Sequence, residues 1–170
     1  MGENEMKILT YPDPVLKTSA SPVNDIDGEL QKIIDRMIET MYIAPGIGLA
    51  ANQVGLLKRV IVFDGSPRQE GRDPLVLINP EITHREEEIK WEEACLSVVD
   101  YTAEVTRNAR VTVQGVDRHG KPMKMDAEEL LAVCLQHEID HLDGTLFIDR
   151  ISSLKRALYK KKLKKKNKEE

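Results

Sequence analysis

The sequence predicts an α+β fold, in which a small mixed sheet of antiparallel strands packs around a central helix and another helix follows at the C-terminus. Two observations support this prediction. Segments with strand patterns gather between segments with helical periodicity, and the two kinds do not alternate as they do in a parallel sheet. The 170 residues suffice for one domain, and 41% hydrophobic with 32% charged residues is typical of a globular protein. We therefore expect a single domain spanning 1–170.

The first helix is expected after Asn24 or Asp25, either of which can cap a helix N-terminus. Apolar residues then recur at helical spacing, at Leu30, Ile33, Ile34, Met37, Ile38 and Met41. Ala44-Pro45-Gly46 should end this helix, because proline cannot continue the hydrogen-bond pattern. A loop over residues 46–55 is expected to lead into the sheet.

The strands are expected where β-branched residues cluster or apolar residues alternate, which occurs at 59–64, 75–78, 81–93 and 105–114. Asn79-Pro80 is expected to close the second of these segments. A turn at 118–121 then returns the chain through Met123 and Met125 as a hairpin.

The central helix is expected to begin at Asp126, because Glu129 completes a pattern similar to a capping box. The residues that follow at helical spacing are Leu130, Val133, Cys134, His137 and His141. Both histidines therefore continue an apolar stripe and should face the interior. Gly144 is expected to end the helix.

A third helix is expected from Ser152 or Ser153, docked on the body through Leu154, Ala157 and Leu158. Residues 155–170 hold nine Lys/Arg and two Asp/Glu, whereas residues 1–154 carry a net charge of −11. An acidic body with a basic tail indicates a polyanionic partner, and the alternative is a solvated helix end. We expect 160–170 to form a flexible basic tail.

The chain lacks the features of secreted and membrane proteins. No segment approaches the ~18 consecutive apolar residues of a membrane span. The N-terminal segment MGENEMKILTYPDP lacks the order of a secretory signal, and two cysteines make a disulfide framework improbable. We expect a soluble cytoplasmic protein with no membrane partner.

The strongest chemical signal is His137-Glu138-Ile139-Asp140-His141, an H-E-x-x-H motif on the central helix. Histidines at i and i+4 lie on one helix face and can bind one metal ion together, with Glu138 beside the first. A pair of buried histidines and a carboxylate without a metal would leave polar groups unsatisfied at a cost in stability.

A third metal ligand is expected from elsewhere in the chain. Downstream of His141 the nearest acids are Asp143 and Asp149, and no histidine follows. Upstream, Cys95 lies in Glu93-Ala94-Cys95-Leu96-Ser97, and one thiolate with two imidazoles leaves a fourth position open, as in catalytic sites. The alternative for Cys95 is a small buried hydrophobe, the role that we expect for Cys134.

A third segment, Gly46-Ile47-Gly48-Leu49-Ala50-Ala51-Asn52-Gln53, allows close backbone approach and offers the Gln53 amide as a donor. It lacks the third glycine and the preceding strand of a dinucleotide loop. In order and type, the three segments resemble the motifs G-x-G-x-A-A-x-Q, E-G-C-L-S and Q-H-E-x-D-H of the peptide deformylases. The resemblance covers about residues 7–151, with Ala94 in place of a usual glycine and Val99 in place of a common proline.

The resemblance implies a metal-dependent hydrolase that removes the formyl group from the N-terminal formylmethionine of nascent polypeptides and releases formate. It implies that Cys95, His137 and His141 hold one Fe²⁺ per chain, which Zn²⁺, Ni²⁺ or Co²⁺ can replace. Thiolate and imidazole ligands by themselves suit zinc. Glu138 would accept the proton of the attacking water, and the resemblance implies the Gln53 amide and the Leu96 backbone N–H as oxyanion donors.

An apolar pocket for the methionine side chain is expected from Ile47, Leu130, Val133 and Cys134, for which the alternative is core packing. The backbone of Gly46, Ile47 and Gly48 is available to pair with an extended substrate. The resemblance also favours the ribosome as the partner of the basic tail. Two other functions remain open: a zinc peptidase, which needs a downstream third ligand, and a catalytically silent relative with a binding role.

Overall fold

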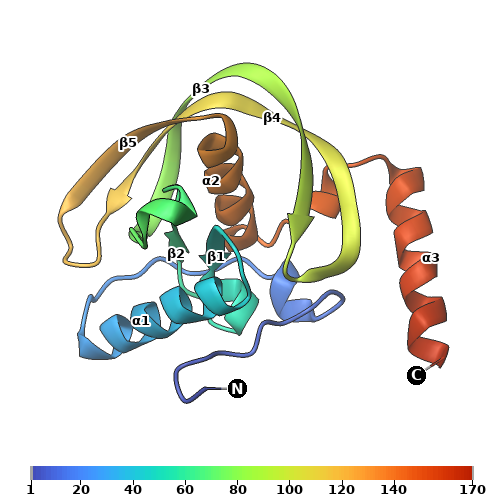
Figure 1. Cartoon of the computed structure of the whole chain (residues 1–170), viewed down its shortest axis with the longest axis horizontal. Helices are drawn as coiled ribbons and strands as arrows, with labels where there is room; N and C mark the ends of the chain where they lie inside the picture. The colour runs from blue at the N-terminus through green and yellow to red at the C-terminus, as the bar shows by residue number, and fades with distance from the viewer. Residues whose placement is uncertain (1, 170) are drawn as a thin grey trace.

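The computed structural model describes residues 2–169 and confirms the α+β class (Figure 1). The elements in chain order are α1 (Gly28–Ile43), β1 (Gly48–Ala50), β2 (Val60–Phe63), β3 (Leu75–Cys95), β4 (Val98–Val116), β5 (Pro122–Glu128), α2 (Glu129–Leu142) and α3 (Ser153–Glu169). The five strands form one sheet in the order β1-β2-β3-β4-β5, and every neighbouring pair is antiparallel, so the sheet is not mixed. No helix within 2–169 has the length and apolar character needed to cross a membrane.

The start of α1 differs from the expectation of a cap at Asn24 or Asp25. Asp27 is the N-cap, and its carboxylate accepts the backbone N–H of Leu30. The expected apolar stripe is confirmed by the buried side chains of Leu30, Ile34, Met37 and Met41. The segment that follows is not only a loop, since β1 pairs with β2 and a single 3-10 turn covers Ala51–Val54.

The strand β3 does not close at Asn79-Pro80 as expected. Asn79 takes a positive φ of 53°, and the pairing with β4 shifts register between Ile78 and Glu81. Pro80 therefore lies at a bulge, where its missing N–H costs no ladder hydrogen bond. The strand continues to Cys95 and forms with β4 a long arch over α2 (Figure 1).

The helix α2 begins at Glu129, so the expected capping box at Asp126 is wrong. Asp126 belongs to β5, where its carboxylate accepts a hydrogen bond from Thr112, and β5 pairs with β4 through Glu128. The helix ends at Leu142, and Gly144 takes a φ of 71° as expected of a helix stop.

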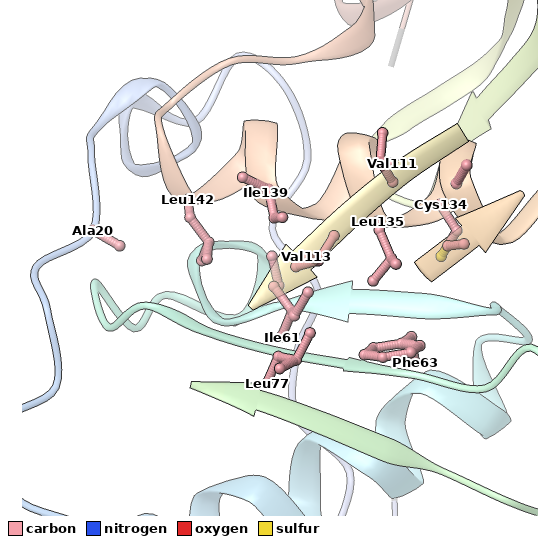
Figure 2. Close-up of a cluster of buried hydrophobic side chains, with 13 residues drawn as sticks. Ala20, Ile61, Phe63, Leu77, Val111, Val113, Cys134, Leu135, Ile139 and Leu142 are labelled. Carbon is pink, nitrogen blue, oxygen red and sulfur yellow. The ribbon is translucent and has the colours of Figure 1, made fainter. Parts of the chain in front are cut away.

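One face of α2 packs on the sheet and places the histidine motif against it. The buried cluster at this contact includes Ile61, Phe63, Leu77, Val111, Val113, Cys134, Leu135, Ile139 and Leu142 (Figure 2). Because close-packed interiors yield little to displacement, this cluster fixes the height and rotation of α2 over the strands.

The helix α3 docks through a different face from the one expected. Of the expected contact residues, Ala157 is exposed, and Leu154 and Leu158 are 67% and 58% exposed. By contrast, Tyr159 is 4% exposed and Leu163 is partly buried. The Tyr159 ring centroid lies 4.5 Å from that of Tyr101. Residues four apart share a helix face. The sequence offers two such apolar pairs, Leu154 with Leu158 and Tyr159 with Leu163, and the pair with Tyr159 contacts the body. The helix continues to Glu169, and the mobility of 160–170 remains a prediction.

We expect Tyr159→Ala to lower the free energy of unfolding by about 3 kcal/mol, because it removes a buried aromatic side chain. Leu158→Ala, one residue earlier on the exposed side, should change it by less than about 0.5 kcal/mol. Urea denaturation of both variants measures the difference. Equal losses would show that both faces of α3 are buried in solution.

Candidate metal centre

Three potential metal ligands from two elements converge beneath the β3–β4 arch. α2 presents His137 and His141 one turn apart, and Cys95 stands at the end of β3. The Nε2 atoms of the two histidines are 3.2 Å apart, and the Cys95 Sγ lies 3.3 Å from His141 Nε2. All three donor atoms lie within 4.8 Å of one another.

This arrangement fits a bound divalent cation. Donor atoms that share one ion at ~2.0–2.3 Å must lie about 3–4 Å apart. Lone pairs that face one another at this distance repel unless a cation or proton lies between them. The His141 atom in this cluster is Nε2; its other ring nitrogen, the buried Nδ1, has no hydrogen-bond partner among residues 2–169. The donor set of one sulfur and two imidazole nitrogens suits a transition metal.

Neither downstream acid joins these donors. Asp143 pairs with Arg59 at 2.9 Å, and Asp149 accepts hydrogen bonds from Lys17 and from the backbone N–H of Leu146. Within the described residues, Cys95 is therefore the third member of the cluster.

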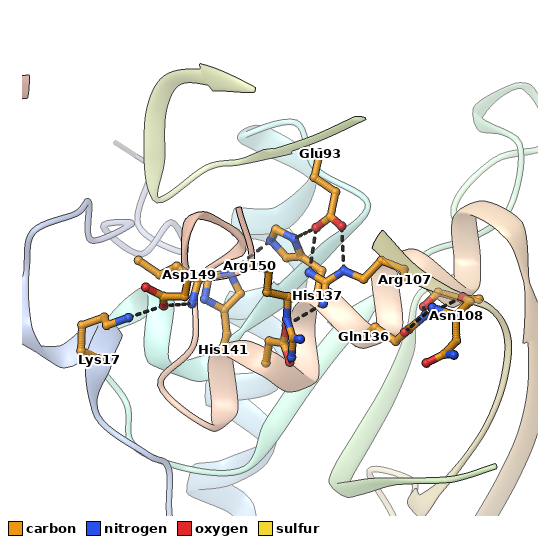
Figure 3. A network of polar contacts seen from close by, with 12 residues as sticks. Lys17, Glu93, Arg107, Asn108, Gln136, His137, His141, Asp149 and Arg150 are labelled. Carbon is orange, nitrogen blue, oxygen red and sulfur yellow. Dashed lines mark hydrogen bonds and ion pairs between the residues drawn. The ribbon is translucent and has the colours of Figure 1, made fainter. Parts of the chain in front are cut away.

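The buried ion pair of Glu93 and Arg107 supports His137 through its Nδ1 atom (Figure 3). Glu93 accepts a hydrogen bond from His137 Nδ1 at 2.8 Å, which directs Nε2 toward the other donors. Both Glu93 oxygens also accept from Arg107, at 2.7 and 2.9 Å. Arg107 further pairs with Asp140 at 2.6 Å, and Arg150 caps Asp140 from the surface.

The charges in this network shift the pKa values of its members. Burial alone would raise the pKa of Glu93, but hydrogen bonds from Arg107 and His137 lower it to about 2. Burial alone would lower the pKa of His137, whereas its hydrogen bonds to Cys95 and Glu93 raise it. The pKa of His141 is lowered, first by burial and then by the charge on His137.

The Gln53 side chain is fixed beside Cys95. Its Oε1 accepts the Ala50 backbone N–H at 3.0 Å, and its Nε2 donates to the Ser97 hydroxyl at 3.1 Å. The same Nε2 lies 3.7 Å from the Cys95 sulfur. The Ser97 backbone N–H donates to that sulfur at 3.4 Å.

These groups lie along a cleft of about 400 Å³ that runs between β1, β3 and α2. The sequence-predicted residues that line it are Gly46, Ile47, Gly48, Gln53, Cys95, Leu96, Leu130, Val133, Cys134, His137 and Glu138. Of the four expected pocket walls, Leu130 is 48% exposed and stands at the rim. His141 is 1% exposed and is not among the residues that line the cleft.

Glu138 is buried at the inner end of the cleft. Its Oε2 has no hydrogen-bond partner among the described residues. Burial raises the pKa of its carboxyl to about 7, although the neighbouring His137 charge opposes the shift. A carboxyl group with a free oxygen at this position can exchange a proton with a molecule in the cleft.

Sequence reasoning missed three contributors to the site, namely Trp91, Glu93 and Arg107. Trp91 and Glu93 lie four and two residues before Cys95, so strand alternation places all three on one face of β3. This alternation could have identified both residues as neighbours of Cys95. Arg107 comes from β4, opposite Ile89, and no local motif marks it.

Comparisons with known proteins agree with this geometry. Residues 5–157 match the family model described as polypeptide deformylase. The chain is 58% identical over 159 residues to a peptide deformylase of Thermodesulfovibrio yellowstonii, covering 94% of this chain and 96% of that one. A peptide deformylase of Syntrophobacter fumaroxidans is 54% identical over 164 residues, covering 96% of both chains.

Solved structures show the same likeness. The crystal structure of a peptide deformylase from Legionella pneumophila has a TM-score of 0.89 and 45% identity, covering 96% of this chain and 95% of that one. The structure of a peptide deformylase from Synechococcus elongatus in complex with actinonin has a TM-score of 0.89 and 40% identity, covering 98% and 90%.

We expect Arg107→Met to cost about 3–5 kcal/mol of unfolding free energy, because it removes the buried counter-charge of Glu93 and leaves Asp140 with Arg150 alone. It should also weaken metal affinity about 10–100-fold through the loss of support for His137. Chelator competition and urea denaturation measure the two effects.

Arg110→Met is the matched control, since Arg110 lies on β4 as Arg107 does. Its ion pairs, with Glu86 and Glu87 of β3, are exposed. It should change stability by less than about 1 kcal/mol. Unchanged metal affinity in Arg107→Met would contradict the supporting role of the ion pair.

Proposed function

The chain belongs to the polypeptide deformylase family, whose function is deformylation of nascent peptides, and we propose which of its residues carry out that reaction. The observation that carries the proposal is the convergence of Cys95, His137 and His141 beside Glu138 at the inner end of one cleft. The family is metal-dependent, and these three residues are the donor cluster that could serve it.

We propose that Cys95, His137 and His141 hold one divalent ion, which is Fe²⁺ in the cell and replaceable by Zn²⁺, Ni²⁺ or Co²⁺. Such an ion supplies Lewis acidity that brings the pKa of a coordinated water toward 7. The hydrogen bonds from Ser97 N–H and Gln53 Nε2 to the Cys95 sulfur fix the position of that atom beside the histidines. Glu93 accepts the hydrogen bond of His137 Nδ1 and so directs the Nε2 atom of His137 toward the other two donors.

Glu138 is the proposed proton carrier. It accepts the proton of the attacking water and delivers it to the amide nitrogen that leaves the formyl carbon. Its burial and its unpartnered Oε2 support this role, because no other protein group competes for that oxygen among residues 2–169.

The negative oxygen that forms at the formyl carbon needs hydrogen-bond donors. We assign this role to the Gln53 amide and the Leu96 backbone N–H. Hydrogen bonds with Ala50 and Ser97 hold the Gln53 amide beside Cys95 before substrate arrives. The N–H of Gln53 that now makes the long 3.7 Å contact to the Cys95 sulfur is the donor that would turn to the oxyanion. The loss of one such donor typically costs about 2.7–4 kcal/mol of transition-state stabilisation.

The apolar part of the cleft is the proposed methionine pocket. Its walls are Ile47, Val133 and Cys134, with Leu130 at the rim and Trp91 added by the structure. The long, flexible thioether side chain of methionine suits a pocket of this irregular shape. The backbone of residues 46–48 lies along the cleft and can pair with the extended peptide.

The zinc-peptidase alternative loses its main requirement in this structure, because Asp143 and Asp149 are engaged elsewhere. A catalytically silent role would expect a missing ligand or base, whereas Cys95, His137, His141 and Glu138 are all present.

We also propose that the basic end of α3 contacts the ribosome and that the protein works in the cytoplasm. The lysines from Lys160 to Lys168 are all exposed, and Lys166 also pairs with Asp100 at 3.1 Å. The surface of a ribosome is rich in phosphate, so a cationic helix should increase the rate of encounter in a salt-sensitive way.

Glu138→Gln should retain the metal and lose about 10²–10⁴-fold in kcat for formate release from formyl-methionyl peptides, because the base is lost and the ligands remain. Cys95→Ala should lose both metal and activity. Metal analysis and a formate assay on the same samples separate the two outcomes. Turnover of Glu138→Gln near that of the unmodified protein would remove Glu138 from proton transfer.

Deletion of residues 160–170 should leave the turnover of a short formylated peptide unchanged while weakening ribosome co-sedimentation at low salt. A control variant with these lysines changed to glutamine keeps the helix length and should show the same loss of co-sedimentation. Binding that persists in both variants would return the tail to the role of a solvated helix end.

A further inference from the structure

The two glycines of the Gly46–Gly48 segment each contact one of the other two motifs. A Cβ built on Gly48 would lie 2.9 Å from Glu138 Cγ, from Glu138 Oε1 and from Cys134 Sγ. A Cβ built on Gly46 would lie 3.2 Å from a terminal methyl carbon of Leu96. The glycine segment therefore meets the helix motif at one residue and the cysteine motif at the other.

The contact at Gly48 leaves no room for a side chain. Carbon atoms of real side chains do not approach other heavy atoms to 2.9 Å, so β1 or the side chains of Glu138 and Cys134 would have to move. β1 is held by its pairing with β2, where Gly48 lies opposite Phe63, and both residues are buried. The Glu138 side chain ends in rotatable bonds and faces the cleft, so it is the part that would yield.

We propose that Gly48 is a positioning residue, whose missing side chain lets β1 rest against Glu138 and hold its carboxylate toward the cleft. This inference rests on the proposed role of Glu138 in proton transfer. The backbone of β1 bounds the carboxylate on one side, and α2 anchors its stem. A reactive group displaced by about 1 Å can lose about 10²-fold in rate.

The contact at Gly46 is of a different kind. Its neighbour is the flexible end of the Leu96 side chain, which also lines the cleft, and Gly46 itself is only half-buried. A methyl group there would displace Leu96 by a few tenths of an ångström and would not reach Glu138. Gly46→Ala therefore serves as a neighbouring variant that changes substrate contact without moving the base.

The test compares three alanine variants of the metal-loaded full chain. Gly48→Ala should lower kcat for a formyl-methionyl peptide by about 10²-fold, with KM changed by less than about 2-fold and metal content unchanged. Gly46→Ala should alter mainly KM. Gly28→Ala, where nothing lies within 4 Å of the added carbon, should behave as the unmodified chain.

Two double variants identify which neighbour matters. Gly48→Ala with Cys134→Ala removes the sulfur contact and leaves the carboxylate contact, so kcat should stay low. Gly48→Ala with Glu138→Asp shortens the acid by one methylene, so kcat should fall no further than in Glu138→Asp alone. Additive losses in this second pair would overturn the proposal.

Other outcomes also decide the matter. If kcat recovers when Cys134→Ala is added to Gly48→Ala, Gly48 is a packing residue and the proposal is overturned. The same follows if Gly48→Ala loses metal or fails to fold both alone and together with Cys134→Ala. A normal kcat in Gly48→Ala would do the same. If the unmodified chain with a full metal load released no formate, the proposed function would fail instead.

Discussion

Three lone-pair donors buried face to face repel one another unless a cation or a proton lies between them, and the fold is organised around this constraint. α2 supplies two of the donors from one turn, and its register over the sheet is set by close packing. Cys95 arrives from a strand that must pass the bulge at Pro80 and run the length of the arch. The long β3–β4 hairpin is therefore what brings the third donor to the helix.

The same constraint explains the charge distribution behind the site. Glu93 fixes the orientation of His137, but a carboxylate at this depth would be costly without a counter-charge. Arg107 supplies that charge and shares it with Asp140, the residue next to His141 in the chain. One buried guanidinium thus balances both Glu93, which supports His137, and Asp140, and Arg150 extends the network to the surface (Figure 3).

Local patterns were enough to predict that Cys95, His137 and His141 lie together, whereas tertiary contacts decided what these patterns could not. The spacing of His137 and His141 fixes their common face in any helix, so this part of the site was predictable. The capping pattern at Asp126 lost to strand pairing with β4, and the choice between the Leu154 and Tyr159 faces of α3 depended on the shape of the body. Arg107 could not be predicted because its partner Glu93 lies on β3, and only the pairing of β3 with β4 brings the two residues together.

The most direct test of this account is X-ray absorption spectroscopy at the edge of the bound metal in the loaded full chain. The account predicts one sulfur scatterer and two imidazole nitrogens, with the sulfur contribution lost in Cys95→Ala. A first shell with only nitrogen and oxygen atoms would contradict the central claim, because Cys95 would then not be a ligand. The edge energy of protein isolated from cells identifies the metal in the same experiment.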